Sequence, residues 1–157
     1  MTNEYIKSFR FSYDELLKMK DAQLQVIING IKDPNESSLL NGLIEVAGTA
    51  SIVLSFCFGL GTAAAVTGTT LSVVSGLSGW EKDALEKATR DGLIFLDELE
   101  RWWRNNPEYD ELEVRMTVLK YVNEGIYYII MNVWEGDDFK IVDYIDMGYV
   151  DGQPVRP

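Results

Sequence analysis

A run of 35 residues without a charged side chain, from Val46 to Trp80, constrains this chain more than any other feature. Ten of these residues are Ser or Thr, six are Gly, and the other nineteen are apolar. Gly59 and Gly61 lie near the middle of the run and predict a bend there. A leucine-rich membrane helix has a different composition, so we expect two short segments that pack closely against each other.

The length of each half limits how this segment can meet a membrane. A spanning helix needs about 20 residues and a spanning strand about 9–11. Residues 46–58 number 13 and residues 62–80 number 19, so two spanning helices do not fit without flanking residues. A helical hairpin buried inside protein fits, because small residues allow close backbone approach. A β-hairpin contributed by each copy of a closed oligomer also fits, because closure pairs the strand edges.

Amphipathic helices are predicted on both sides of the apolar segment. Ser12–Glu15 and Ser78–Glu81 have capping-box spacing, in which a hydroxyl and a Glu three residues later satisfy free amides at a helix start. Apolar residues at steps of three and four predict helices from these boxes as far as Gly30 and Asn105, with Trp103 in the core. A further helical run covers 36–45.

The C-terminal third is expected to begin with one more long helix. Pro107 suits the first turn, and apolar residues at steps of three and four predict a helix over 112–134. Residues 139–150 fit either an edge strand or short helical turns, and residues 1–11 show no clean period.

These elements predict a mainly all-α fold. We expect a bundle of four or five helices around the Gly/Ser/Thr-rich apolar hairpin, with a short irregular or β C-terminal tail. The length favours a single helical domain over 1–157, with the apolar segment at 46–80 and an acidic tail at 135–157.

Charge and residue usage exclude several classes of function. The net charge of −11 argues against a nucleic-acid partner, because phosphates would be repelled. The chain has no His, and its single cysteine, Cys57, lies in the apolar segment. We therefore expect no catalytic residues, no metal site and no cofactor, and predict that the chain is not an enzyme. The N-terminus lacks a basic stretch leading into an apolar run, so no signal peptide is expected. The predicted location is the cytoplasm of the producing cell, or outside it after release without a classical signal.

The order of features resembles the N-terminal helical domain of the three-domain insecticidal crystal δ-endotoxins, over about residues 36–134. The counterparts are a glycine-rich apolar segment (Leu39–Gly79), Trp80, a helix ending in Trp (Leu93–Trp103), the Asn106-Pro107 break and a long helix (Leu112–Trp134). In that family the helical domain is implicated in membrane insertion and pore formation, so the resemblance implies the same activity here.

Two functions are therefore predicted. The first is a membrane-active, pore-forming or toxin-like helical protein, soluble before insertion, with a lipid bilayer and a homo-oligomer as partners. The residues expected to insert are Val46, Ile52, Val53, Leu54, Phe56, Phe58, Gly59, Gly61, Val66, Leu71, Val73, Val74 and Trp80. Arg101, Trp102 and Arg104 are candidates for an interface with a membrane or a partner. The alternative is a small acidic interaction protein of the immunity or inhibitor type, which binds a basic protein and keeps the apolar segment as core.

Overall fold

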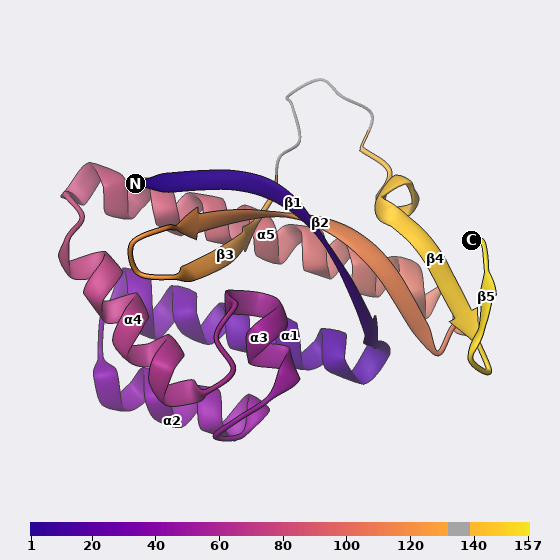
Figure 1. The fold of residues 1–157 in the computed structure, drawn as a ribbon, viewed down its shortest axis with the longest axis horizontal. Helices are drawn as coiled ribbons and strands as arrows, with labels where there is room; N and C mark the ends of the chain where they lie inside the picture. Colours follow the sequence, from indigo (N-terminus) through magenta and orange to yellow (C-terminus); the bar gives the residue numbers. More distant parts are fainter. Residues whose placement is uncertain (132–138) are drawn as a thin grey trace.

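The computed structural model describes residues 1–131 and 139–157 and has an α+β architecture (Figure 1). The described helices are α1 (Tyr13–Val26), continued by the π-helix η1 (Ile27–Lys32), then α2 (Glu36–Ala47), α3 (Ile52–Phe58), α4 (Ala63–Ser75), α5 (Gly79–Arg104) and the short 3₁₀-helix η2 (Ile141–Tyr144). The described strands are β1 (Thr2–Ser12), β2 (Glu111–Tyr121), β3 (Ile126–Ile130), β4 (Ile145–Val150) and β5 (Gln153–Val155).

The prediction of a mainly all-α bundle is wrong, because five strands form an antiparallel sheet. The helix expected over 112–134 is replaced by β2 and β3. In β2 the buried residues are every second one, which is the period of a strand: Leu112, Val114, Met116 and Val118. Residues four positions apart lie on the same face of both a strand and a helix. The spacing of Leu112 and Met116 therefore suggested a helix where the structure has a strand. Residues 132–134 of the predicted helix lie outside the described residues.

The N-terminal residues also form a strand where the sequence showed no clear period. Strand β1 pairs antiparallel with β2 along its whole length, from Thr2 opposite Tyr121 to Ser12 opposite Glu111. Only Phe9 and Phe11 of β1 are fully buried. The alternation of fully buried residues is therefore confined to one end of the strand, and at the other end only Tyr5 is partly buried.

Other predicted elements are confirmed. Both capping boxes are present, at Ser12 with Glu15 and at Ser78 with Glu81. The helix predicted over 36–45 is α2, and α5 ends at Arg104, beside the predicted stop. Trp103 is buried. In the tail, residues 139–150 contain both expected alternatives, a single turn of 3₁₀-helix followed by β4, while residues 135–138 lie outside the described part.

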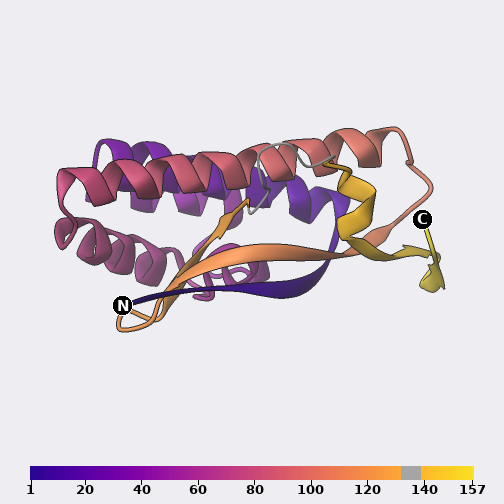
Figure 2. The same cartoon turned by 90° about the horizontal axis from the view of Figure 1, so that it is seen from above.

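Helix α5 runs along one face of the sheet (Figure 2), and α1 to α4 lie to one side of both, below them in the view of Figure 1. Strand β2 is central: β1 pairs with one of its edges, and β3 and β4 pair with different halves of the other. The backbones of α5 and β3 approach closely at Gly92, where an added Cβ would lie 2.0 Å from the Ile129 carbonyl oxygen. Every residue of β3 is buried.

The apolar segment forms α3 and α4 with a left-handed turn between them. Gly59 ends α3 with a φ of 74°, in agreement with the predicted bend. Two backbone hydrogen bonds join the segments that precede and follow α3. Ser51 N donates to Gly61 O at 2.9 Å, and Ala63 N donates to Thr49 O at 3.0 Å. Within the described residues, no helix combines the length and apolar character needed to cross a bilayer.

Candidate functional site

The residues predicted to insert into a membrane are spread between the core and the surface. The buried ones are Val53, Leu54, Phe58, Val66, Val73 and Val74. The half-buried ones are Val46, Phe56, Gly61 and Leu71. Exposed ones are Ile52, Gly59 and Trp80. The buried set packs in the same core cluster as the sheet, so the structure does not gather these residues into one surface site.

The predicted interface residues Arg101, Trp102 and Arg104 lie at the C-terminal end of α5. Each has a partner within the molecule: Trp102 stacks on Tyr109 with ring centroids 5.7 Å apart, and the two arginines form ion pairs with glutamates of α5. A hollow of about 280 Å³ lies here, lined by Tyr13, Trp103, Arg104, Pro107 and Tyr109.

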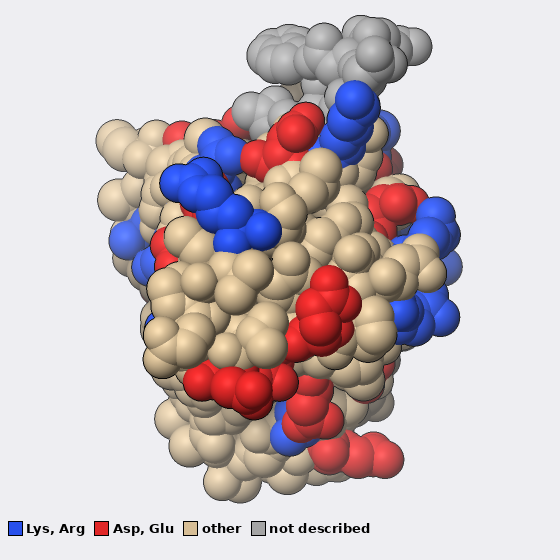
Figure 3. Space-filling view, turned by 90° about the vertical axis from the view of Figure 1, so that its right-hand side faces the viewer, with Lys and Arg blue, Asp and Glu red and all other residues tan. Residues whose placement is uncertain are grey.

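This end of the molecule does not select one kind of partner. Figure 3 views it directly and shows basic and acidic side chains distributed around an uncharged centre. The indole of Trp103 donates a hydrogen bond to Tyr109 O at 2.9 Å, and Tyr13 packs edge-on against the same indole at 5.6 Å. The aromatic groups around the hollow therefore already bind one another.

A more open groove lies at the opposite end of α5, between the first half of this helix and the sheet. Two hollows of about 280 and 250 Å³ share Glu4, Ala84 and Ala88 in their walls. The remaining walls come from four elements and the turn before α5: Thr2, Leu77, Trp80, Glu81, Leu85, Lys87, Asp91, Leu119, Tyr121, Ile130 and Met131. We call this surface the α5–sheet groove.

The groove exists because small residues line α5 where it faces the sheet. Trp80, Ala84 and Ala88 recur every four residues and so share one face of the helix. The methyl groups of the two alanines leave space that a larger side chain would fill. Farther along, Gly92 allows α5 to touch β3, so the gap closes at that point.

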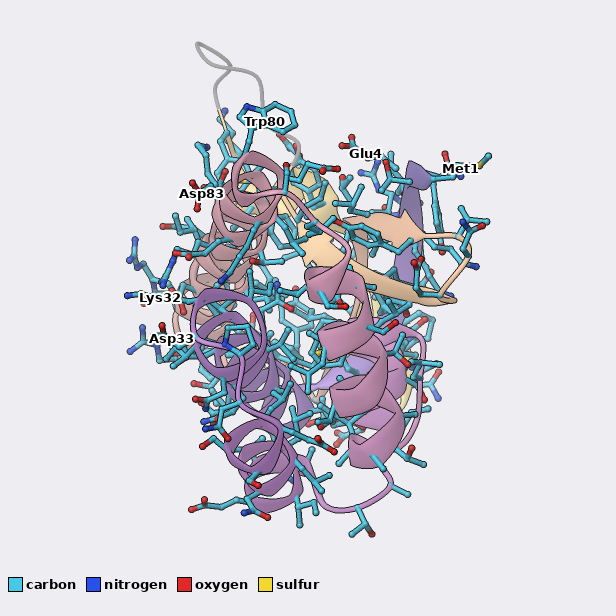
Figure 4. The ribbon with its side chains drawn as sticks, turned by 90° about the vertical axis from the view of Figure 1, so that its left-hand side faces the viewer. Met1, Glu4, Lys32, Asp33, Trp80 and Asp83 are labelled. Carbon is cyan, nitrogen blue, oxygen red and sulfur yellow. The ribbon has the colours of Figure 1, made fainter. Side chains whose placement is uncertain are left out.

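Trp80 is a large apolar side chain in this groove, and 78% of its surface is exposed to solvent. Figure 4 shows Trp80 at the start of α5, with Glu4 and Met1 on the strand side and Asp83 on the other side of the helix. Exposed apolar patches with a polar rim mark interaction surfaces or ligand-binding grooves, and tryptophan is enriched among the residues that dominate binding energy.

Carboxylates outnumber cations around the groove. Glu4, Glu81 and Asp91 face a single cation, Lys87, which pairs with Asp91 at 3.0 Å. The Glu81 carboxylate accepts a hydrogen bond from Ser78 N, and this bond holds its pKa below the ordinary value. On the groove floor, burial raises the pKa of Tyr121, and the negative charges of Glu81 and Glu124 add to this effect. The groove is therefore apolar at its floor and negative at its rim.

No group of three or more acidic or cysteine side chains lies close enough to hold a metal ion among residues 1–131 and 139–157. The lone thiol, Cys57, is buried, and burial raises its pKa. The chain matches no protein-family model, no curated protein and no solved structure. The resemblance to the δ-endotoxin helical domain stays a prediction.

Sequence reasoning placed Trp80 among the inserting residues and missed the rest of the groove. The signal that was available is the repeat of Trp80, Ala84 and Ala88 on a helix whose neighbouring stripe, Leu85 and Thr89, is buried. The strand walls, with Glu4 and Leu119, could not be assigned while their segments were not recognised as strands.

Proposed function

We propose that this chain is an acidic protein-binding module whose α5–sheet groove holds an apolar side chain of a basic partner. The observation that carries this proposal is the exposed Trp80 beside an apolar hollow whose rim holds Glu4, Glu81 and Asp91. An indole provides a large contact area, and carboxylates around it favour partners with Lys or Arg beside their apolar anchor.

The role of the apolar segment supports binding over membrane insertion. Leu54, Phe58 and Val66 have no exposed area and pack in the core. Releasing these side chains at a bilayer would remove part of that core, whereas groove binding leaves it unchanged. Membrane insertion therefore remains a prediction, and the binding function is the one we favour.

Selection of short peptides from a random phage-displayed library on the immobilised intact protein tests the proposal. We expect the selected peptides to combine an aromatic or aliphatic anchor with Lys or Arg. Their affinity should fall by about tenfold or more in Trp80→Ala, because aromatic anchors dominate such contacts. It should also fall as salt rises, because exposed charges are screened.

Two variants sharpen this test. Glu4→Gln removes a rim carboxylate and should weaken binding, whereas Asp83→Asn removes an equal charge on the opposite side of α5 and should not. Peptides that bind Trp80→Ala as tightly as the parent protein, or that carry no basic residues, would overturn the proposal.

A further inference from the structure

The outer edge of β1 is a row of backbone donors and acceptors without a partner strand among the described residues. β1 is an end strand of the sheet and pairs only with β2 there. It is 11 residues long, contains no Pro, and its pairing with β2 shows no register shift. Long, regular edge strands pair readily with other strands, and proteins usually shorten, bulge or cover them.

The hydrogen-bond pattern shows which residues face this edge. Val122 N donates to Met1 O at 3.1 Å, so Met1 and Val122 form a hydrogen-bonded pair. Such pairs alternate along an antiparallel ladder, so the odd-numbered residues of β1 bond to β2. The N–H and C=O groups of Thr2, Glu4, Ile6, Ser8 and Arg10 therefore point away from the sheet.

Ile6 is the centre of this outward row and is 66% exposed, although it is a large apolar residue within a strand. Glu4 and Arg10 lie on the same sheet face as Ile6, two and four residues away. The charged residues among positions 1–12 are Glu4, Lys7 and Arg10, which give this segment a net charge of +1. Since the whole chain carries −11, the remaining residues carry −12. The β1 edge therefore lacks the net negative charge through which the rest of one copy repels another.

We propose that the outer edge of β1 pairs antiparallel with β1 of a second copy of this chain, with Ile6 of each copy opposite Ile6 of the other. The outward-facing backbone groups belong to even-numbered residues, so a two-fold axis perpendicular to the sheet pairs even-numbered residues of one copy with even-numbered residues of the other. With Ile6 at the axis, Glu4 faces Ser8, Thr2 faces Arg10, and the five outward residues of each copy form roughly ten backbone hydrogen bonds.

The exposed apolar side chain of Ile6 selects this register over its neighbour, because with the axis at Ile6 the two Ile6 side chains lie directly opposite each other. If the axis passed through Lys7, Glu4 would face Arg10, but Ile6 would face the polar Ser8 and two ammonium groups would lie directly opposite each other, which is destabilising. With the axis at Ile6, Lys7 faces Tyr5 on one sheet face, and Glu4 lies diagonal to Arg10 of the partner on the other. Arg10 donates hydrogen bonds to Glu111 of its own chain through Nε and Nη2. Its Nη1 group is therefore left to bind the Glu4 carboxylate of the second copy.

The mass of the intact protein, measured by sedimentation from micromolar to several hundred micromolar concentration, tests the proposal. We expect a monomer–dimer equilibrium that shifts towards the dimer as salt rises, because salt screens repulsion between copies that each carry −11. Ile6→Lys should weaken the dimer by about tenfold or more, because it places like charges opposite each other. Trp80→Ala should leave the dimer unchanged, which separates this inference from the proposed groove function.

Cysteine substitutions test the register. The native Cys57 is buried, so an added surface thiol reacts without interference. Ile6→Cys should form a disulfide-linked dimer under mild oxidation, because facing residues of a ladder lie within disulfide range. Ser8→Cys is the matched control and should not, because its facing residue is Glu4. A protein that stays monomeric at all concentrations and salts, or cross-linking of Ser8→Cys in preference to Ile6→Cys, would overturn the proposal.

Discussion

Gly92 of α5 lies so close to Ile129 of β3 that a Cβ added at Gly92 would be 2.0 Å from the Ile129 carbonyl oxygen. The same carbonyl accepts a hydrogen bond from Gln23 Nε2 of α1 at 2.9 Å, and this amide nitrogen also donates to Thr89 O of α5 at 3.2 Å. Helix α1, helix α5 and strand β3 therefore meet at one buried point, which fixes α5 against the sheet.

Gly92→Ala should destabilise the protein strongly. The added methyl group meets backbone rather than a movable side chain, so α5 and β3 must separate. We expect the free energy of unfolding to fall by about 3 kcal/mol or more. Urea unfolding followed by circular dichroism measures the change.

Gly68→Ala is the matched control for this substitution. Gly68 lies inside α4, and an added Cβ would have no atom within 4 Å. We expect a gain of about 0.5–1 kcal/mol from helix propensity. A similar gain in Gly92→Ala would contradict the prediction, because it would mean that the contact with Ile129 leaves room for a methyl group.

The hydroxyl pair of Thr70 and Tyr128 joins α4 to the sheet. Their oxygens lie 2.9 Å apart and are buried, and burial raises the pKa of the Tyr128 phenol. Tyr128→Phe and Thr70→Val should each cost about 1–3 kcal/mol, because each leaves the other hydroxyl without this partner. The double variant should cost less than the sum of the two, with a coupling of about 1 kcal/mol. Strictly additive losses would show that the two hydroxyls do not bind each other.

The helical half of this fold was predictable because its signals are local. Ser12 with Glu15 and Ser78 with Glu81 place the helix starts, and each interaction spans only three residues. The heptad-like spacing of α5 has no strand alternative, because the buried residues Thr89, Leu96 and Trp103 recur every seven residues, and an odd step would place successive ones on opposite faces of a strand.

The sheet depends on contacts that local patterns do not contain. The pairing of Ile6 with Thr117 joins residues more than a hundred positions apart. Only two residues of β1, Phe9 and Phe11, are buried, so its apolar alternation is too short to recognise. Between β2 and β3, the turn residue Gly125, which has a φ of 73°, was a local signal against a continuous helix. The α5–sheet groove shares this difficulty, because two of its walls are strands.

The ion pair between Lys20 and Glu100 should make stability depend on acid. Lys20 Nζ lies 2.5 Å from Glu100 Oε1, and this bond holds the pKa of Glu100 below the ordinary value of 4.5. A carboxyl whose pKa is lowered by folding adds stability that is fully present above its unfolded-state pKa and is lost as pH falls through the folded-state pKa. Glu100→Gln should thus cost about 1 kcal/mol at pH 7, and the difference should shrink below pH 4.5.

Glu98→Gln is the control for the acid dependence. Glu98 pairs with Arg101 on the same helix, where the Arg side chain is 64% exposed. Because solvent screens such pairs, its loss should change the free energy of unfolding by under about 0.5 kcal/mol at every pH. Equal effects of the two substitutions would show that the Lys20 contact adds nothing beyond a surface charge.

Release of a trapped dye from lipid vesicles separates the two functions predicted from the sequence. Leu54, Phe58 and Val66 are completely buried, and exposing each of them costs about 1.5–3 kcal/mol before any contact with lipid is made. The net charge of −11 also opposes approach to anionic lipid. We therefore expect no release from phosphatidylcholine vesicles or from vesicles containing phosphatidylserine at pH 7. Lowering the pH towards 4 neutralises part of the exposed carboxylates and reduces the net negative charge, so the same assay at pH 4 gives insertion its best conditions. Release at either pH that is lost when Leu54 is replaced by Asp in a protein that still folds would favour membrane insertion over groove binding.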